Sequence, residues 1–85
     1  MYGTLFGKDA ARVLRRMPRK TALRIRDKID DVARDPHAPN SNVRKLTARP
    51  GYPLRVGDWR VIYDVDDALR ILAVERVGPR GGVYE

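Results

Sequence analysis

Two arginines that face each other across a predicted turn are the side chains whose type and spacing point most directly to chemistry. In "PLRVGDWRVIY", residues 53–63, two apolar runs flank Gly57-Asp58, a pair suited to a two-residue hairpin loop. That loop places Arg55 directly opposite Arg60. Like charges in this position destabilise an antiparallel pair by about 0.2–1 kcal/mol. Two guanidinium groups become favourable there once an anion lies between them, so the spacing indicates a phosphodiester site.

The alternation of side chains along the predicted strands decides which residues share a face with the two arginines. The face expected to pack on the helices carries Leu54, Val56, Trp59, Val61 and Tyr63, joined by Leu72 and Val74 if Asp66-Asp67 is also a two-residue loop. The opposite face then carries Arg55, Arg60, Ile62, Ile71, Ala73 and Glu75. On this arrangement the two arginines lie near the middle of a half-polar face, with Ala73 as a small neighbour.

An ordinary explanation of the two arginines stays open beside the anion site. Arginine is frequent in this chain, and Asp58, Asp64 or Glu75 offers a carboxylate on the same predicted hairpins. Exposed ion pairs of this kind contribute only about 0–1 kcal/mol to folding. A solvated, charge-balanced surface is therefore the alternative to a binding site.

Other residue types that are common in active sites have structural explanations here. His37, the sole histidine, lies in a proline-flanked loop where solvation is the expected state. The acidic pair Asp30-Asp31 is expected on a helix and Asp66-Asp67 in a turn, without a third ligand at metal-binding spacing. We therefore predict neither a metal site nor a cofactor site. Tyr84 is different, because an aromatic beside a basic cluster is suited to stacking on a nucleobase.

Composition narrows the class of partner. The chain has 85 residues and a net charge of +7, from 18 Lys and Arg against 11 Asp and Glu. Such a balance favours nucleic acid, an anionic membrane surface or an acidic protein as partner, with plain surface solubility as the alternative. There is no cysteine, which excludes disulfides and thiolate zinc sites. Neither a membrane span nor a signal pattern is present, so a cytoplasmic protein without membrane contact is expected.

The elements that must position these residues follow from periodicity. A short strand is expected in residues 2–6, then a helix from Lys8 with Asp9 as its N-cap, and a second helix after Pro18. Residues 35–42 read as a loop, and strands are expected at about 52–56, 59–65 and 69–77. The prediction is a single α+β domain over residues 1–85. Its helical hairpin packs on one face of a small, mainly antiparallel sheet in the order β-α-α-β-β-β.

Two stretches of the chain resemble the RelE/ParE toxin superfamily, and in particular its RelE branch. They are "LRVGDWRVIYDVDD" and "ILAVERVGPRGGVY", and the spacing from the helices through "DPH" to "RKL" also agrees. The resemblance covers roughly residues 8–84 and implies the fold predicted above. It also implies a ribosome-dependent endoribonuclease that cuts messenger RNA in the ribosomal A site. Such toxins work without a metal ion, through attack of the substrate 2′-hydroxyl on the adjacent phosphate.

The resemblance also implies roles for individual residues. Arg60 matches the arginine that stabilises transition-state charge, and Arg80 matches one linked to phosphate contact and leaving-group protonation. Tyr84 matches the aromatic that stacks on the substrate base. Arg55 stands where some members have a lysine proposed as the general base. RNA contacts are implied for the two cations of "RKL", Arg44 and Lys45.

The chain departs from the family pattern at several of these positions. Pro53 stands where a second basic residue is frequent, and Pro79 where His or Lys is common. Two glycines, Gly81 and Gly82, replace residues that are usually charged. Arg55 is a poor general base because its pKa lies far above neutrality, so Glu75 is an alternative. These departures leave the fold prediction unchanged and count against full cleavage activity.

Three functions follow as hypotheses. The leading one is an mRNA-cleaving toxin of a type II toxin–antitoxin pair, a monomer when free and a hetero-oligomer with an acidic antitoxin, with the ribosome and mRNA as its other partners. The second is a ParE-like inhibitor of DNA gyrase, against which the pair Arg80 and Tyr84 argues. The third is a non-catalytic relative that only binds its antitoxin.

Overall fold

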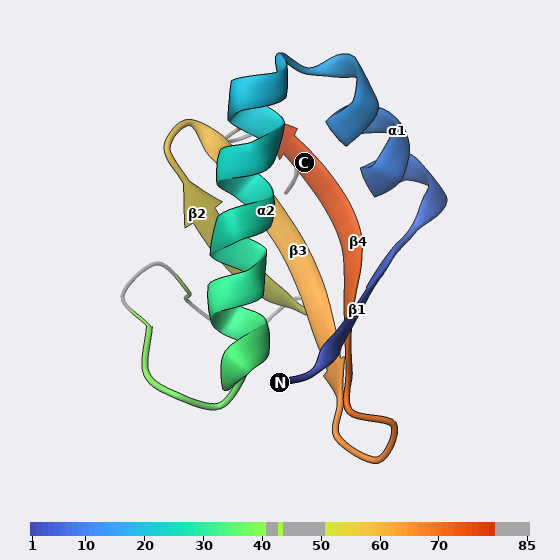
Figure 1. Ribbon diagram of the computed structural model, residues 1–85, viewed down its shortest axis with the longest axis vertical. Helices are drawn as coiled ribbons and strands as arrows, with labels where there is room; N and C mark the ends of the chain where they lie inside the picture. Colours follow the sequence, from blue (N-terminus) through green and yellow to red (C-terminus); the bar gives the residue numbers. More distant parts are fainter. Residues whose placement is uncertain (41–42, 44–50, 80–85) are drawn as a thin grey trace.

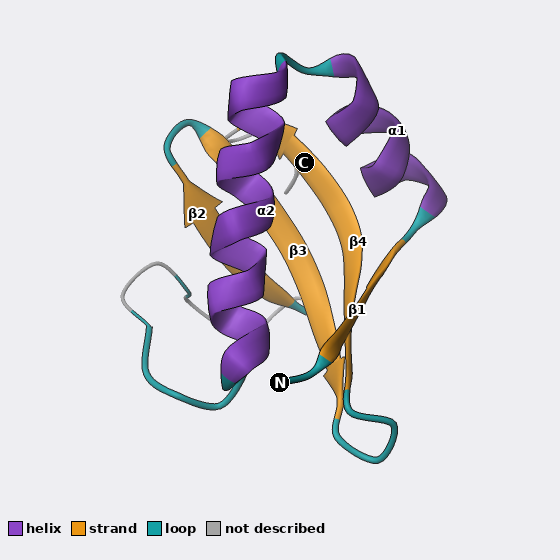
Figure 2. Ribbon diagram, in the orientation of Figure 1, coloured by secondary structure: helices purple, strands orange, loops and turns teal. Residues whose placement is uncertain are grey.

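A four-stranded mixed sheet carries both helices on one of its faces in the computed structural model, which describes residues 1–40, 43 and 51–79 (Figures 1 and 2). The elements are β1 (Gly3–Phe6), α1 (Lys8–Arg16), α2 (Arg19–Arg34), β2 (Tyr52–Val56), β3 (Trp59–Asp66) and β4 (Ile71–Pro79). The strand order is β1-β4-β3-β2; β1 is parallel to β4, and the other two pairs are antiparallel. The predicted α+β fold is confirmed.

The two helices separate where the sequence predicts. Pro18 follows Met17, whose backbone is extended (φ −85°, ψ 163°), as expected for a residue before proline. The helix α1 begins at Lys8, as predicted, but its N-cap is Gly7 and not Asp9. The N–H of Gly7, which follows β1, donates to the carbonyl of Val74 on β4. Asp9 lies in the first turn instead, where it pairs with Arg12 and favours the helix dipole. Neither described helix is long and apolar enough to cross a membrane.

The core lies between α2 and the centre of the sheet. The predicted apolar stripe of α2 is buried at Ile25, Ile29, Val32 and Ala33. It meets the predicted inward residues of the sheet, which are buried as well: Leu54, Val56, Val61, Tyr63, Leu72 and Val74. Full burial of one such aliphatic side chain stabilises the fold by about 1.5–3 kcal/mol. Trp59, also predicted to be core, is half-buried at the margin of this cluster.

The β2–β3 hairpin has the predicted register. Arg55 pairs with Arg60 and Val56 with Trp59, so the loop is the two residues Gly57 and Asp58. Gly57 has a φ of +58°, which corresponds to the glycine at the first central position of a type II′ turn. The turn chemistry therefore sets the pairing of the two arginines.

The β3–β4 connection is longer than predicted. Asp66 pairs with Ile71, so the loop has four residues, 67–70, and Arg70 within it has a φ of 53°. The Asp66 carboxylate accepts a hydrogen bond from the Leu69 N–H at 3.0 Å and closes the turn. The predicted and the observed pairing of β4 with β3 differ by an even number of residues, which leaves each side chain of this part of β4 on its predicted face. Leu72 and Val74 therefore still face the core, as predicted, although β4 begins and ends two residues later.

Candidate nucleic-acid interface

Arg55 on β2 and Arg60 on β3 lie on the sheet face that points away from the helices, hereafter the open face. Arg55 is exposed, and Arg60 is half-buried with its Nε atom out of contact with solvent. The predicted small neighbour is wrong: Ala73 pairs with Asp64, whereas Arg60 pairs with Gly78. The longer β3–β4 loop and an irregularity in β4 together shift this pairing. Gly78 adds no side chain beside the Arg60 guanidinium.

The irregularity is a β-bulge that brings another arginine to the open face. Tyr63 pairs with Val74 but Ile62 pairs with Arg76, so Glu75 is an extra residue in β4. Glu75 and Arg76 are consequently both exposed. Because Ile62 shares a face with Arg60, its partner Arg76 lies there too.

Sequence reasoning missed Arg76, although a signal was present. Strict alternation from Val74 would turn Arg76 toward the core and leave Val77 outside. The structure instead buries both valines, with two polar residues between them. Two adjacent charged residues between two inward valines are the pattern that a bulge requires. Bulges are frequent next to active sites, because they redirect a side chain.

Part of the open face is covered. Pro53 and its partner Ile62 are buried although they lie on this face. Part of the cover is Gly51, which precedes β2 with a φ of +87°. A Cβ at Gly51 would lie 2.9 Å from Cγ2 of Ile62. The accessible part of the face therefore lies toward Arg55, Arg60 and Arg76.

The carboxyl group of Glu75, the extra residue of the bulge, interacts with the carboxyl group of Asp64 on β3. Burial raises the pKa of the Glu75 carboxyl, and a hydrogen bond with Asp64 raises it further, whereas Arg76 lowers it. Glu75 carries the carboxylate nearest to the open-face arginines in the strand register, and a carboxylate can accept a proton as a general base.

Four of the predicted site residues lie outside the described residues: Arg80, Tyr84, Arg44 and Lys45. Their roles stay predictions. Of the predicted set, the structure brings together Arg55 and Arg60, in direct register on neighbouring strands.

His37 has a defined partner, which its loop position did not predict. Its Nε2 lies 2.7 Å from Oδ1 of Asp67 in the β3–β4 loop, and the Tyr2 hydroxyl donates to the same oxygen at 2.6 Å. The hydrogen bond to Asp67 raises the pKa of His37. The hydrogen bonds from Tyr2 and His37 lower the pKa of Asp67. The side chains of His37 and Asp67 are more than half exposed, and the cluster joins the N-terminus to two loops.

No metal centre is formed by the residues that the structure describes, since none of them make a group of three or more His, Cys, Asp or Glu side chains. A cavity of about 420 Å³ lies between the end of α2 and the β2–β3 edge. Tyr52 and Tyr63 line it, and their rings stack at a centroid distance of 5.5 Å. Burial raises the pKa of Tyr63 to about 12, so its phenol stays protonated. The arginines of the open face are not among the residues that line this cavity.

The chain is similar to toxins of type II toxin–antitoxin systems in sequence and in fold. Residues 5–84 match the profile of the ParE toxin of the type II toxin–antitoxin system parDE. Curated protein sequences yield no match. The isolated RelE toxin of E. coli aligns with a TM-score of 0.78 at 25% identity, over 99% of this chain and 92% of that one.

Two further solved structures share the fold. The archaeal RelE–RelB complex from Pyrococcus horikoshii aligns with a TM-score of 0.78 at 26% identity, covering 95% of this chain and 97% of that chain. A RelBE toxin–antitoxin complex from Mycobacterium tuberculosis gives a TM-score of 0.74 at 22% identity, over 93% of this chain and 98% of that chain. In sequence the match is to ParE, whereas these similar structures are of RelE toxins.

Proposed function

The chain belongs to the ParE toxin family, within the RelE/ParE superfamily of type II toxins, and from this premise we propose that it is a ribosome-dependent endoribonuclease. The observation that carries the proposal is the pairing of Arg55 with Arg60 on the open face, with Arg76 on the neighbouring strand. Three guanidinium groups on adjacent strands are suited to a bent sugar-phosphate backbone. A toxin that only contacts protein does not require this convergence of like charges.

The proposed reaction is a transesterification within the messenger RNA. The substrate 2′-oxygen attacks the adjacent phosphorus, and the bond from phosphorus to the 5′-oxygen breaks. The proton of the 2′-hydroxyl leaves to a base, and the 5′-oxygen receives a proton from an acid. The products are a 2′,3′-cyclic phosphate and a 5′-hydroxyl, and the proton balance needs neither a metal ion nor a cofactor.

Each arginine has a place in this reaction. Arg60 stabilises the extra negative charge on the phosphate oxygens in the transition state, an effect worth a factor of about 10²–10³ for one donor in comparable sites. Arg55 holds the phosphate from the neighbouring strand. Arg80 protonates or orients the leaving oxygen, and Tyr84 stacks on a base. Arg44 and Lys45 contact RNA outside the reacting phosphate.

We assign the partners on the same grounds. An acidic antitoxin would neutralise a chain of net charge +7 and cover the open-face arginines. The Pyrococcus relative was crystallised with RelB, an antitoxin. The ribosome would position the messenger RNA, so cleavage of free RNA should be weak.

Induced expression of matched variants tests the proposal. Arg60→Ala should lower cleavage at A-site codons by at least 10²-fold and relieve growth arrest, because a transition-state contact is lost. The control is Arg34→Ala, which removes an equally charged but exposed residue on α2, paired with Asp31 at 2.5 Å. Transcript ends mapped by primer extension give the readout. Equal cleavage by both variants would contradict the assignment of Arg60.

A ParE-like activity on DNA gyrase is the second candidate, and the match to the ParE profile favours it. Double-strand DNA breaks in arrested cells, with intact transcripts, would support that function and exclude cleavage of mRNA. A non-catalytic relative is the third, favoured by the departures at Pro53 and Pro79. Harmless expression of folded toxin without its antitoxin would support that third function.

A further inference from the structure

Two interacting carboxyl groups, those of Asp64 and Glu75, lie on the same face of the sheet as the arginines. Asp64 is two residues beyond Ile62 on β3, so it shares the open face with Ile62 and Arg60. The hydrogen bond between the Glu75 and Asp64 side chains therefore places the Glu75 carboxyl on the open face as well. Ionised carboxyl groups repel the phosphate groups of RNA, so their presence on a proposed RNA surface calls for an explanation.

The β-bulge determines how close Glu75 lies to the arginines. Glu75 is the extra residue in β4, and Arg76 next to it pairs with Ile62. Arg60 is two residues from Ile62 on β3, a separation of about 7 Å along the strand. Glu75 therefore lies one step along the sheet from the place where Arg60 and Arg76 are proposed to contact a phosphate.

The backbone of the bulge is held on its other side by the junction between β1 and α1. The N–H of Gly7 donates to the carbonyl of Val74 at 2.8 Å. A Cβ on Gly7 would lie 3.6 Å from the carbonyl oxygen of Glu75 and 3.8 Å from its Cα, so the junction packs directly on this residue. The charged residues that follow Gly7, Lys8 and Asp9, are exposed. A fixed backbone beneath an exposed side chain is what a preorganised catalytic group requires.

An ion pair does not account for Glu75. Among the ion pairs formed within the described part of the chain, none includes this residue. Its carboxyl interacts with a second carboxyl instead, which destabilises the fold when both groups are ionised. The charged groups that act on it are Asp64 on β3 and Arg76 beside it on β4. Natural proteins keep locally unfavourable arrangements of this kind mainly at functional sites.

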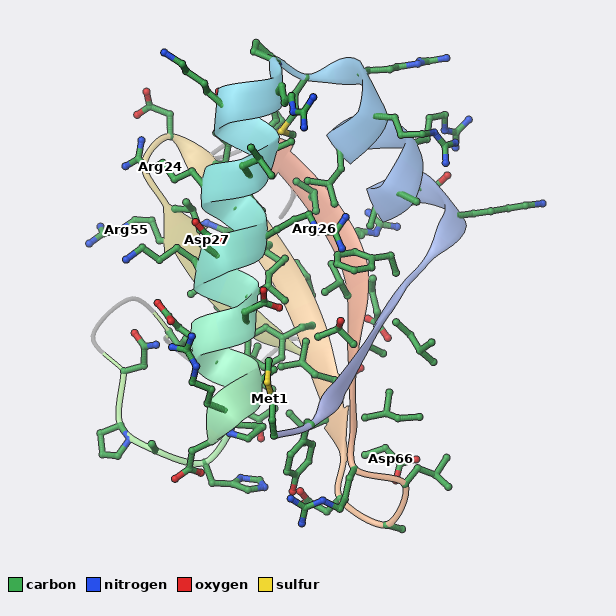
Figure 3. The ribbon with its side chains drawn as sticks, viewed as in Figure 1. Met1, Arg24, Arg26, Asp27, Arg55 and Asp66 are labelled. Atoms are coloured by element: carbon green, nitrogen blue, oxygen red, sulfur yellow. The ribbon has the colours of Figure 1, made fainter. Side chains whose placement is uncertain are left out.

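The other proton-accepting groups of the described residues lie away from the arginines. Asp66 closes the β3–β4 loop through a hydrogen bond, and Figure 3 shows it at the opposite end of the sheet from Arg55. His37 is bonded to Asp67, outside the open face. The pair of Glu75 with its β3 partner is therefore the proton-accepting group that the described strands place beside the arginines.

We propose that Glu75 removes the proton from the 2′-hydroxyl of the message, and that Asp64 is the positioning residue that holds the Glu75 carboxyl. This inference rests on the proposed function and names the base that the reaction requires. The proton of the 2′-hydroxyl passes to the Glu75 carboxylate, the 2′-oxygen forms its bond to phosphorus, and the bond from phosphorus to the 5′-oxygen breaks. The 5′-oxygen takes a proton from the acid of the proposed reaction, and Glu75 returns its proton to water.

Asp64 also affects the ionisation of its partner. Burial raises the pKa of Glu75 most, and the hydrogen bond and negative charge of Asp64 raise it further, whereas Arg76 lowers it. A carboxylate with a raised pKa is a stronger base, but it acts only where it is ionised. The cleavage rate should therefore fall in acid as Glu75 becomes protonated, and the midpoint of this fall should depend on Asp64.

Single-turnover cleavage of a ribosome-bound message, measured across pH, tests the role of Glu75. Glu75→Gln should lower the rate at neutral pH by about 10²–10⁴-fold and keep or exceed the wild-type affinity for programmed ribosomes. Glu75→Asp, which keeps a carboxylate, should cleave faster than Glu75→Gln. The control is Asp58→Asn, which removes an exposed carboxylate from the β2–β3 turn near the same arginines and should keep the wild-type rate. Glu75→Gln should also keep or exceed the wild-type melting temperature, which shows that the lower rate is not unfolding.

The variant Asp64→Asn tests the positioning role. It should keep most of the activity and move the acid limb of the pH–rate profile to lower pH, because an amide can hold the Glu75 carboxyl without a negative charge. An NMR titration of the Glu75 carboxyl in the free protein should show the same downward shift of its pKa. A purely structural role of Asp64 would change the rate by the same factor at every pH.

The outcomes separate this inference from the proposed function. Cleavage by Glu75→Gln at the wild-type rate, or equal losses in Glu75→Gln and Asp58→Asn, would overturn the role of Glu75 and leave the nuclease intact. An acid limb that stays in place in Asp64→Asn would overturn the role of Asp64. Wild-type protein that cuts no ribosome-bound message at any pH would contradict the proposed function itself, and the proton acceptor with it.

Discussion

The two faces of the sheet differ in what their residues do. The covered face packs aliphatic side chains such as Val61 and Leu72 against α2, with almost no exposed surface. The open face carries arginines at Arg55, Arg60 and Arg76, and its strand ladder is broken by a bulge. The residues that stabilise the fold by burial and the residues proposed to act on RNA therefore lie on opposite faces of the same sheet. Substitutions on the covered face should act on stability, and substitutions of the open-face arginines on activity.

The largest expected effect breaks the covered face. Ile25→Ala removes a side chain with 0% exposure and leaves a cavity between α2 and the sheet. The free energy of unfolding should fall by about 2–5 kcal/mol, measured by urea denaturation. Molecules that remain folded should keep normal activity. Loss of activity in fully folded Ile25→Ala protein would contradict the separation of the two faces.

A smaller effect is expected where the open face is covered. Gly51→Ala places a Cβ at a φ of +87° and 2.9 Å from Ile62, so backbone strain and a contact both oppose it. The expected loss of stability is about 1–3 kcal/mol. Gly57→Ala, also at positive φ but without a contact under 3.0 Å, is the comparison. A larger loss for Gly57→Ala would show that the Ile62 contact does not matter.

The carboxyl pair next to the bulge predicts a pH effect. The pKa of Glu75 is raised above its ordinary value of 4.5, chiefly by burial, so the folded state binds its proton more tightly than the unfolded state. Ionisation of Glu75 therefore destabilises the fold above the raised pKa, and this cost is absent below the ordinary value. Glu75→Gln should be slightly more stable than wild type at neutral pH and equal to it in acid. Thermal melts across pH give the measurement, and a difference that grows in acid would contradict the assignment.

The smallest effect concerns the cluster of His37, Asp67 and Tyr2. The pKa of His37 is raised by its hydrogen bond to Asp67, so protonated His37 stabilises the fold below its ordinary pKa of 6.5. This contribution is lost as the pH rises through the higher folded pKa. His37→Gln should remove that dependence on pH and leave cleavage unchanged, because the cluster lies outside the open face. A change in cleavage would bring His37 into the site.

The sequence predicts the parts of this fold that depend on local patterns. Apolar periodicity identified α2, Pro18 separated it from α1, and Gly57-Asp58 set the register that pairs Arg55 with Arg60. The alternation of side chains along β4 placed Leu72 and Val74 on the covered face correctly, although the loop before them has four residues and not the predicted two. These features depend on residues that are close together in the chain.

The parts that were missed depend on longer-range geometry. The bulge at Glu75 arises from how β4 meets β3, and together with the longer β3–β4 loop it places Gly78, not Ala73, beside Arg60. The bond from His37 to Asp67 joins residues 30 positions apart. The burial of Ile62 depends in part on its contact with Gly51, which is 11 positions earlier in the chain, and no local sequence pattern predicts this contact.

The chemistry of the cut RNA ends tests the central claim most directly. Purified protein, in wild-type and Arg60→Ala forms, is incubated with ribosomes carrying a defined message, and the new 3′ ends are analysed. Wild-type protein should release fragments that end in a 2′,3′-cyclic phosphate at the A-site codon, and Arg60→Ala should release at least 10²-fold fewer. Intact message, or equal yields of the same ends from both proteins, would contradict the account.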